Sequence, residues 1–161
     1  MNKKANNANE SGKCGEHLIY ESLANHNIKY MPQKDLVGKF GFFKKRVNVD
    51  ALTYNNVVIE IKRQMTSGTV DEKLEGTYST LKDITTKNVN ENFSDVLEFS
   101  GNGVSKGVLV FLGPFNGDGM RLFIINKFKE LQEETKDFSN PIKICFGIDE
   151  FESPIHEGWI T

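Results

Sequence analysis

Three charged side chains near the middle of the chain have the spacing of a metal-binding or catalytic group. Asp50 lies in one run rich in β-branched residues, and Glu60 and Lys62 hold alternate positions in the next run, within segment 48–64. Strand side chains alternate between two faces, so Glu60, Lys62 and the following Gln64 share one face. Two neighbouring carboxylates repel each other when both are ionised, and a bound cation removes that repulsion. The group therefore predicts a site for a hard divalent ion such as Mg²⁺, with a cross-strand set of salt bridges on a solvated face as the alternative.

The strands that carry these groups are predicted to form a hairpin, and its register decides whether Asp50 joins the other two. A three-residue loop at 54–56 gives one apolar face, whose cross-strand pairs are Thr53–Val57, Ala51–Ile59 and Val49–Ile61. A two-residue loop would mix charged and apolar groups on both faces, so the apolar pattern favours the longer loop. We therefore expect Asn56 at positive φ and Asp50 directly opposite Glu60.

The segment after the hairpin predicts a helix packed on the core. Thr69 and Glu72 have the spacing of a capping box, which indicates a helix that begins near Val70. The apolar positions that follow recur at helical spacing: Val70, Leu74, Tyr78, Leu81 and Ile84.

Taken together, these motifs resemble the PD-(D/E)XK nuclease superfamily. The pattern Asp50…Glu60-Ile61-Lys62 is similar to its core, and Gly-x-x-Gly-Glu at 12–16 is similar to the start of its first helix. A Ser-Gly-Thr turn at 67–69, followed by Asp-Glu-Lys-Leu, resembles type II restriction endonucleases and their phage relatives more closely. The resemblance covers most of the chain in layout, but only Glu16, Asp50 and 60–74 residue by residue.

The resemblance implies roles for these residues. The catalytic set it implies is Asp50, Glu60, Lys62, Glu16 and Gln64. In that set Asp50, Glu60 and the Ile61 carbonyl would hold Mg²⁺, with Mn²⁺ as a substitute, and Lys62 would orient the attacking water. Glu16 would contact and orient these metal ligands without binding the first ion itself, or it would hold a second ion.

Basic and polar residues that could contact a phosphate backbone fall in two segments. Lys44, Lys45 and Arg46 form a run in segment 35–46, where a lead-in strand with a solvated charge cluster is an equal alternative. The second set follows the hairpin and comprises Arg63, Ser67 and Lys73, of which the last is also explained as a solvated lysine.

Three functions agree with this sequence. The first is a Mg²⁺-dependent endonuclease that cuts double-stranded DNA at a specific sequence, as a restriction enzyme or phage relative does. The second is a Holliday junction resolvase, and the third is a nuclease-fold DNA-binding module without catalysis. The joint presence of Asp50, Glu60 and Lys62 favours an enzyme. Two-fold DNA is cut most simply by a two-fold protein, so we expect a homodimer.

The composition limits which classes of protein this chain can belong to. The 161 residues carry a net charge of −2, so any basic DNA-binding surface must be local. No apolar run has the length of a membrane span, and no pattern indicates a small-molecule cofactor. Cys14 and Cys145 are expected to be free thiols in a cytoplasmic protein. His17, His26 and His156 share no ligand spacing, and core or surface roles are expected for them.

The predicted fold is α/β (α+β), with a central mixed sheet flanked by helices, as in restriction endonucleases. We expect a flexible stretch at 1–10 and one domain over 11–161, whose first helix is capped by Ser11. The elements expected around the hairpin are a strand at 29–33, an irregular connection at 85–105 with a short helix at 94–99, a strand at 106–113, a helix at 120–131, a strand at 142–146 and an acidic tail.

Overall fold

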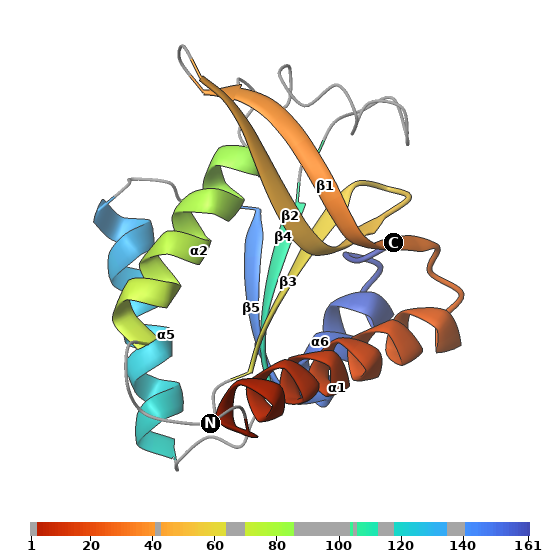
Figure 1. The fold of residues 1–161 in the computed structure, drawn as a ribbon, viewed down its shortest axis with the longest axis horizontal. Coiled ribbons are helices and arrows are strands. Elements are labelled where there is room, and N and C mark those ends of the chain that lie inside the picture. Colours follow the sequence, from red (N-terminus) through yellow and green to blue (C-terminus); the bar gives the residue numbers. More distant parts are fainter. Residues whose placement is uncertain are drawn as a thin grey trace.

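The computed structural model describes residues 3–40, 43–63, 70–85, 104, 106–112, 118–134 and 141–161. These residues form a five-stranded mixed sheet with helices on both faces, which confirms the predicted fold class (Figure 1). The elements, in chain order, are α1 (Lys3–Asn25), β1 (Tyr30–Phe40), β2 (Phe43–Thr53), β3 (Val57–Arg63), α2 (Val70–Thr85), β4 (Lys106–Leu112), α5 (Asp118–Glu134), β5 (Ile142–Phe146) and α6 (Gly147–His156).

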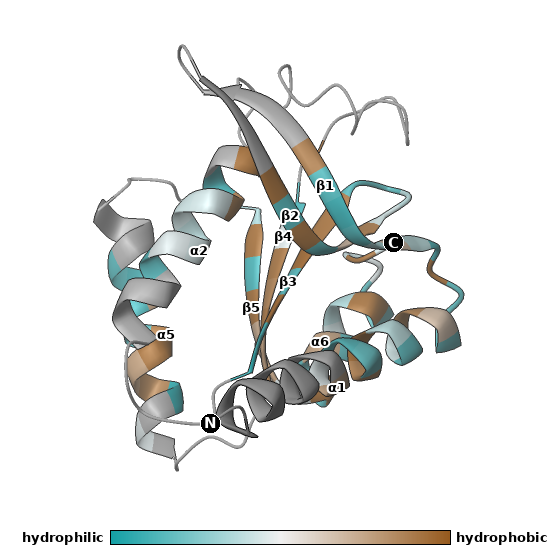
Figure 2. Ribbon diagram, in the orientation of Figure 1, coloured by the Kyte–Doolittle hydropathy of each residue, from teal (hydrophilic) through white to brown (hydrophobic). Residues whose placement is uncertain are grey.

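The sheet has the order β1-β2-β3-β4-β5. β1 pairs with β2, and β2 with β3, in antiparallel fashion, whereas β3 pairs with β4, and β4 with β5, in parallel. Parallel strands are covered by helices on both faces, and for that reason β3 and β4 are apolar along most of their length (Figure 2). The pair β1 and β2 curves away from the rest of the sheet (Figure 1).

Two apolar layers sandwich the sheet. One joins α1 and α6 to the sheet through Ile19 and Phe151, and it includes Val57 and Ile59 of β3. The other joins α2 and α5 to the opposite face, which includes Val58 of β3. The alternation of Val57, Val58 and Ile59 between layers is the two-residue period of a strand.

The closed end of the β2–β3 hairpin has the predicted register. Ala51 pairs with Ile59, and Asn56 closes the loop at φ 60 while its amide donates to the Thr53 carbonyl at 2.9 Å. The predicted pairing of Val49 with Ile61 is wrong, because the ladder between these strands ends at Ala51 and Ile59. Val49 instead packs in the layer of Val58, not in that of Ala51.

Two other predicted boundaries are wrong. The first helix begins at Lys3, so Ser11 lies inside it and is not its cap; whether residues 1–10 are flexible stays a prediction. One strand, β1, replaces the short strand at 29–33 and extends to Phe40, and the basic run 44–46 belongs to β2. The expected short helix at 94–99 lies outside the described residues.

The C-terminal tail is an amphipathic helix, which the sequence-based prediction missed. Phe151 and Pro154 of α6 are buried against the sheet, and Asp149 lies in its first turn, where acidic residues are favourable. The acidic residues and Pro154 concealed the helical spacing of Ile148, Phe151 and Ile155.

On α5, Ile124 and Phe128 are buried one turn apart as predicted. Phe123, which was predicted to share the apolar stripe, is 44% exposed because it lies off that stripe. Cys14 and Cys145 are both free. No helix in the described part of the chain is long and apolar enough to cross a membrane.

Candidate active site

The candidate site lies where the β2–β3 ladder ends. One carboxylate oxygen of Asp50, Oδ2, accepts a hydrogen bond of 2.7 Å from the backbone amide of Ile61. A side chain therefore takes the position that a backbone carbonyl holds in a regular ladder. Asp50 was predicted to stand directly opposite Glu60 on one face of the hairpin. That prediction is wrong, because the Asp50 carboxylate lies in line with the ladder.

Glu16 of α1 reaches Asp50 through an intermediate side chain. The Gln33 amide nitrogen donates to Oε2 of Glu16 at 3.0 Å and to Oδ1 of Asp50 at 3.4 Å. One amide nitrogen thus contacts both carboxylates. The chain Glu16–Gln33–Asp50 brings together two residues that the sequence placed far apart, and it lies on the α1 side of the site.

Gln33 was not among the predicted site residues. Its neighbours Pro32 and Lys34 pair with Ala51 and Val49, so Gln33 stands opposite Asp50 in an otherwise continuous register. Its φ is 47, a left-handed conformation that non-glycine residues rarely adopt. Such strain often marks functional sites. A polar residue in a strand was the only sequence signal, and nothing local indicated the positive φ.

Tyr20 is a second residue that the sequence-based prediction missed. Its hydroxyl donates to the Asp50 backbone carbonyl at 2.7 Å, and its ring stacks on Tyr30 with 5.2 Å between centroids. Burial raises the pKa of Tyr20 to about 12, and the charges of Glu16 and Asp50 add to the rise. The hydroxyl therefore stays protonated near neutral pH and can donate. Its spacing of four residues from Glu16 on one helix face could have indicated it.

Close packing of α1 places Glu16 at the site. Gly15 is buried where α1 crosses the sheet, and a Cβ at that position would stand 3.0 Å from Leu112 Cδ1. A side chain at this position would crowd Leu112, so glycine favours the close approach. The Gly-Glu pair that resembled the family motif thus has a physical basis: the glycine lets the helix come near, and the glutamate follows it.

Glu60 and Lys62 form the other half of the site. The Lys62 ammonium donates to Glu60 Oε2 at 3.3 Å, and both residues line a cleft of about 230 Å³ beside α2. They share a face, as the sequence predicted. Burial raises the pKa of Glu60 from 4.5 to about 7; Lys62 opposes this rise, and the charges of Asp50 and Glu16 add to it.

This arrangement fits a divalent cation. The donors are carboxylate oxygens, which Mg²⁺ prefers, and a cation would relieve the charge and burial that hold the Glu60 proton. The amide and carbonyl of one strand residue point to the same side, so the Ile61 carbonyl also faces the end of the ladder. Among the described residues, the carboxylates of Glu16, Asp50 and Glu60 do not all bring an oxygen within 4.8 Å of one another.

The other predicted site residues are only partly described. Gln64 and Ser67 lie outside the described residues. Lys44, Lys45 and Arg46 belong to β2 and Lys73 to α2, but the described structure does not include their side chains. Arg63 ends β3 and is half-buried near Gly15, so its carbon chain packs against α1.

Comparison with known proteins gives one match. A family model described as a PD-(D/E)XK nuclease superfamily domain matches residues 7–141, which include Glu16, the β2–β3 hairpin and β4. Neither the comparison with curated proteins nor that with solved structures gives a match.

Proposed function

The chain belongs to the PD-(D/E)XK nuclease superfamily, and from this premise we propose that it is a Mg²⁺-dependent DNA endonuclease whose active site is the open end of the β2–β3 hairpin. The observation that carries the proposal is the gathering of Asp50, Glu60 and Lys62 where the ladder ends. A purely structural hairpin would complete the ladder with backbone bonds and would leave no buried carboxylate with a raised pKa.

In this proposal Asp50, Glu60 and the Ile61 carbonyl hold the metal ion. Bound Mg²⁺ would supply Lewis-acid activation of the scissile phosphate. Lys62, whose side chain is 37% exposed, is free to turn from Glu60 towards a water or a phosphate oxygen. Its positive charge then stabilises the negative charge that develops during in-line attack. Two hydrogen bonds hold Asp50 in place: Gln33 donates to its carboxylate, and Tyr20 donates to its backbone carbonyl.

The curved β1–β2 pair supplies a surface for the DNA backbone. It extends beyond the sheet next to the site, and its sequence between 34 and 46 contains five basic residues. Phosphate contacts of this kind position a duplex without reading its sequence. We assign Lys44, Lys45 and Arg46 to this contact, together with Arg63, Ser67 and Lys73 near the active site.

Within this class, we favour a sequence-specific enzyme of the restriction type that acts as a homodimer. One such site cuts one strand, so two copies related by a two-fold axis cut both strands of a palindromic duplex. A Holliday junction resolvase would use the same residues on a four-way junction. Cleavage assays on four-way junction DNA and on linear duplex distinguish the resolvase from the restriction-type enzyme.

The test is cleavage of supercoiled plasmid with Mg²⁺, or with Mn²⁺ as a substitute, followed by mapping of the ends. We expect linear product with defined ends, and loss of cleavage by about 10³-fold in Lys62→Ala, because a charge that acts on the transition state is removed. Lys129→Ala, which changes an exposed lysine of α5, is the matched control. A Lys62→Ala protein that cuts at the wild-type rate would disprove the assignment of this site.

A further inference from the structure

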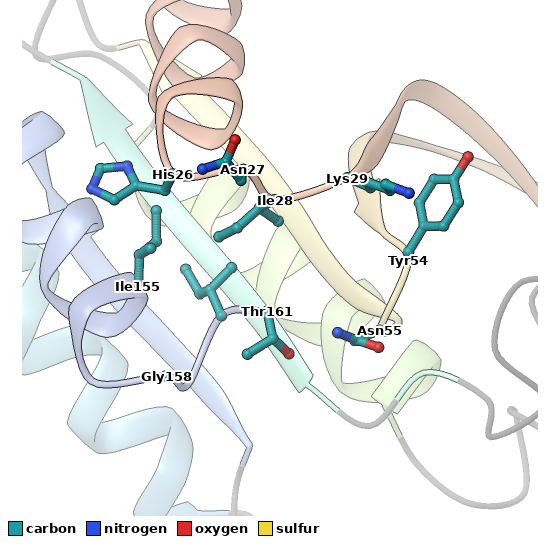
Figure 3. Close-up of a pocket in the computed structure, with 10 residues that line it drawn as sticks. His26, Asn27, Ile28, Lys29, Tyr54, Asn55, Ile155, Gly158 and Thr161 are labelled. Atoms are coloured by element: carbon teal, nitrogen blue, oxygen red, sulfur yellow. The ribbon is translucent and has the colours of Figure 1, made fainter.

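A second cluster of ligand-type side chains lies at the C-terminal end of α1, more than two turns beyond Glu16. His26 follows the last residue of α1, and Glu152 and His156 stand one turn apart on α6. Each offers one donor atom, and the three atoms all lie within 4.8 Å of one another. The two imidazole rings meet edge to face, with 5.0 Å between their centroids. Figure 3 shows His26 beside Ile155 of α6, at the edge of a groove of about 440 Å³.

The hydrogen bonds around this cluster leave metal-binding atoms available. Nδ1 of His26 lies 2.8 Å from the backbone carbonyl of Ser22. A carbonyl only accepts, so Nδ1 donates in this bond, and in the neutral ring Nε2 then presents its lone pair. The buried Ser22 hydroxyl donates to Oε1 of Glu152 at 2.8 Å, which leaves Oε2 as a ligand. Outer partners of this kind orient the ligands in metal sites and fix the histidine tautomer.

We infer that His26, Glu152 and His156 form a binding site for Zn²⁺ or a similar transition-metal ion, distinct from the nuclease site. Two imidazoles and one carboxylate suit Zn²⁺, whereas Mg²⁺ prefers oxygen ligands alone. Ligands that share a tetrahedral Zn²⁺ stand about 3.3 Å apart, so donor atoms within 4.8 Å of one another would have to move closer by side-chain rotation when an ion binds. His156 is exposed, and water completes the coordination from that side.

The ion would fasten two helices that already contact each other here, through the Ser22–Glu152 hydrogen bond and the His26–His156 ring contact. α6 is held on the sheet by buried Phe151, and α1 carries Tyr20 and Glu16 towards the nuclease site. A metal link between His26 and α6 therefore fixes the end of the helix that delivers Glu16. Its first effect is on stability, because an ion that binds only the folded chain stabilises it by mass action.

The test is calorimetric titration of the EDTA-treated protein with Zn²⁺, accompanied by thermal unfolding. We expect one Zn²⁺ bound per chain by this cluster, with a raised Tm, and no comparable response to Mg²⁺ at these residues. His156→Gln and His26→Ala should each weaken Zn²⁺ binding by at least about 10-fold. Because His156 is exposed, its variant keeps the fold, and circular dichroism verifies this for both variants.

Two matched variants locate the ion. His17→Ala removes an exposed imidazole of the same helix, 71% exposed and paired with Glu21, and should leave Zn²⁺ binding unchanged. Asp50→Ala disables the nuclease site and should also retain it. Cobalt substitution should give a visible absorption band that disappears in His156→Gln. Absence of saturable Zn²⁺ binding, or binding lost in Asp50→Ala but kept in His156→Gln, would overturn the inference.

Discussion

The two ends of the β2–β3 hairpin differ in what completes their hydrogen bonds. At the closed end, Ala51 pairs with Ile59, and the Thr53 hydroxyl accepts from the Val57 amide at 3.1 Å within a buried apolar layer. At the open end, the Asp50 carboxylate accepts from the Ile61 amide, and pairing stops. The same two strands thus form a finished ladder at one end and a ladder interrupted by a charged group at the other.

This difference separates stability from chemistry within one element. The closed end pairs the backbone amides of Asn56 and Val57 within the hairpin, through hydrogen bonds to Thr53. The open end keeps two carboxylates and an ammonium group close together, at the cost of a raised pKa at Glu60 and a left-handed residue at Gln33. Sites that break local rules in this way are where function is expected. Substitutions at the open end should therefore affect cleavage, and those at the closed end should affect folding.

The largest effect is expected at Asp50. In Asp50→Asn the side-chain oxygen can still accept from the Ile61 amide, so the fold is retained while the negative charge is lost. Single-turnover cleavage should fall by about 10³-fold, and calorimetric Mg²⁺ binding should weaken in parallel. Asp149→Asn, on the exposed side of α6, is the matched control and should cut normally. An Asp50→Asn enzyme with near-normal cleavage would remove the open end from the mechanism.

The next effect is a pH dependence of stability set by Glu60. Its folded-state pKa of about 7 lies above the ordinary value of 4.5, so the folded state holds a proton that the unfolded state releases. In the metal-free protein this contribution is present in acid and decreases as pH rises from 4.5 to 7, by about 3 kcal/mol. Urea unfolding in EDTA at successive pH values measures it.

Two changes should remove this dependence. Glu60→Gln has no proton to release, so its stability should stay level over that pH range. Under the proposed function Mg²⁺ would bind the ionised carboxylate, so the stabilisation it gives should grow as pH rises. If the metal-free wild-type protein became more stable between pH 4.5 and 7 relative to Glu60→Gln, the burial argument for Glu60 would be wrong.

A moderate effect is expected at the link between Glu16 and Asp50. Gln33→Gly removes the amide that bonds both carboxylates but tolerates the positive φ, so stability should hold while cleavage slows by about 10–100-fold. Glu16→Ala should slow cleavage to a similar extent. If the two act through one chain, the double variant will be no slower than the worse single variant. Additive losses in single-turnover rates would show that they act separately.

The smallest effect on cleavage is expected at Asn56, in the closed end. Asn56→Ala must keep a left-handed φ without the asparagine side chain, which should cost about 1–2 kcal/mol of unfolding free energy. Asn56→Gly also loses the side chain but tolerates that φ, so it should be the more stable of the two. Both should cut at the wild-type rate below their Tm. A cleavage defect without a stability defect would contradict the separation of the two ends.

The sequence by itself determined those features that depend on local patterns. Apolar alternation selected the closed-end register of Ala51 with Ile59, and turn chemistry predicted the positive φ of Asn56. Alternation also placed Glu60 and Lys62 on one face, and apolar runs predicted the mixed sheet and its order of elements. Each of these follows from residues close together in the chain, because strand and helix periods fix where neighbouring side chains point.

Only the tertiary structure decided where Asp50 lies and what surrounds it. The two-residue period breaks where β1 and β2 curve, so Asp50 enters the ladder and Val49 changes layer. Gln33 reaches the site through a backbone conformation that no local pattern indicated, and Glu16 arrives because α1 packs closely at Gly15. The meeting of His26 and His156 likewise requires two helices from opposite ends of the chain. Contacts between distant segments are set by packing of the whole core, and a local sequence period carries no information about them.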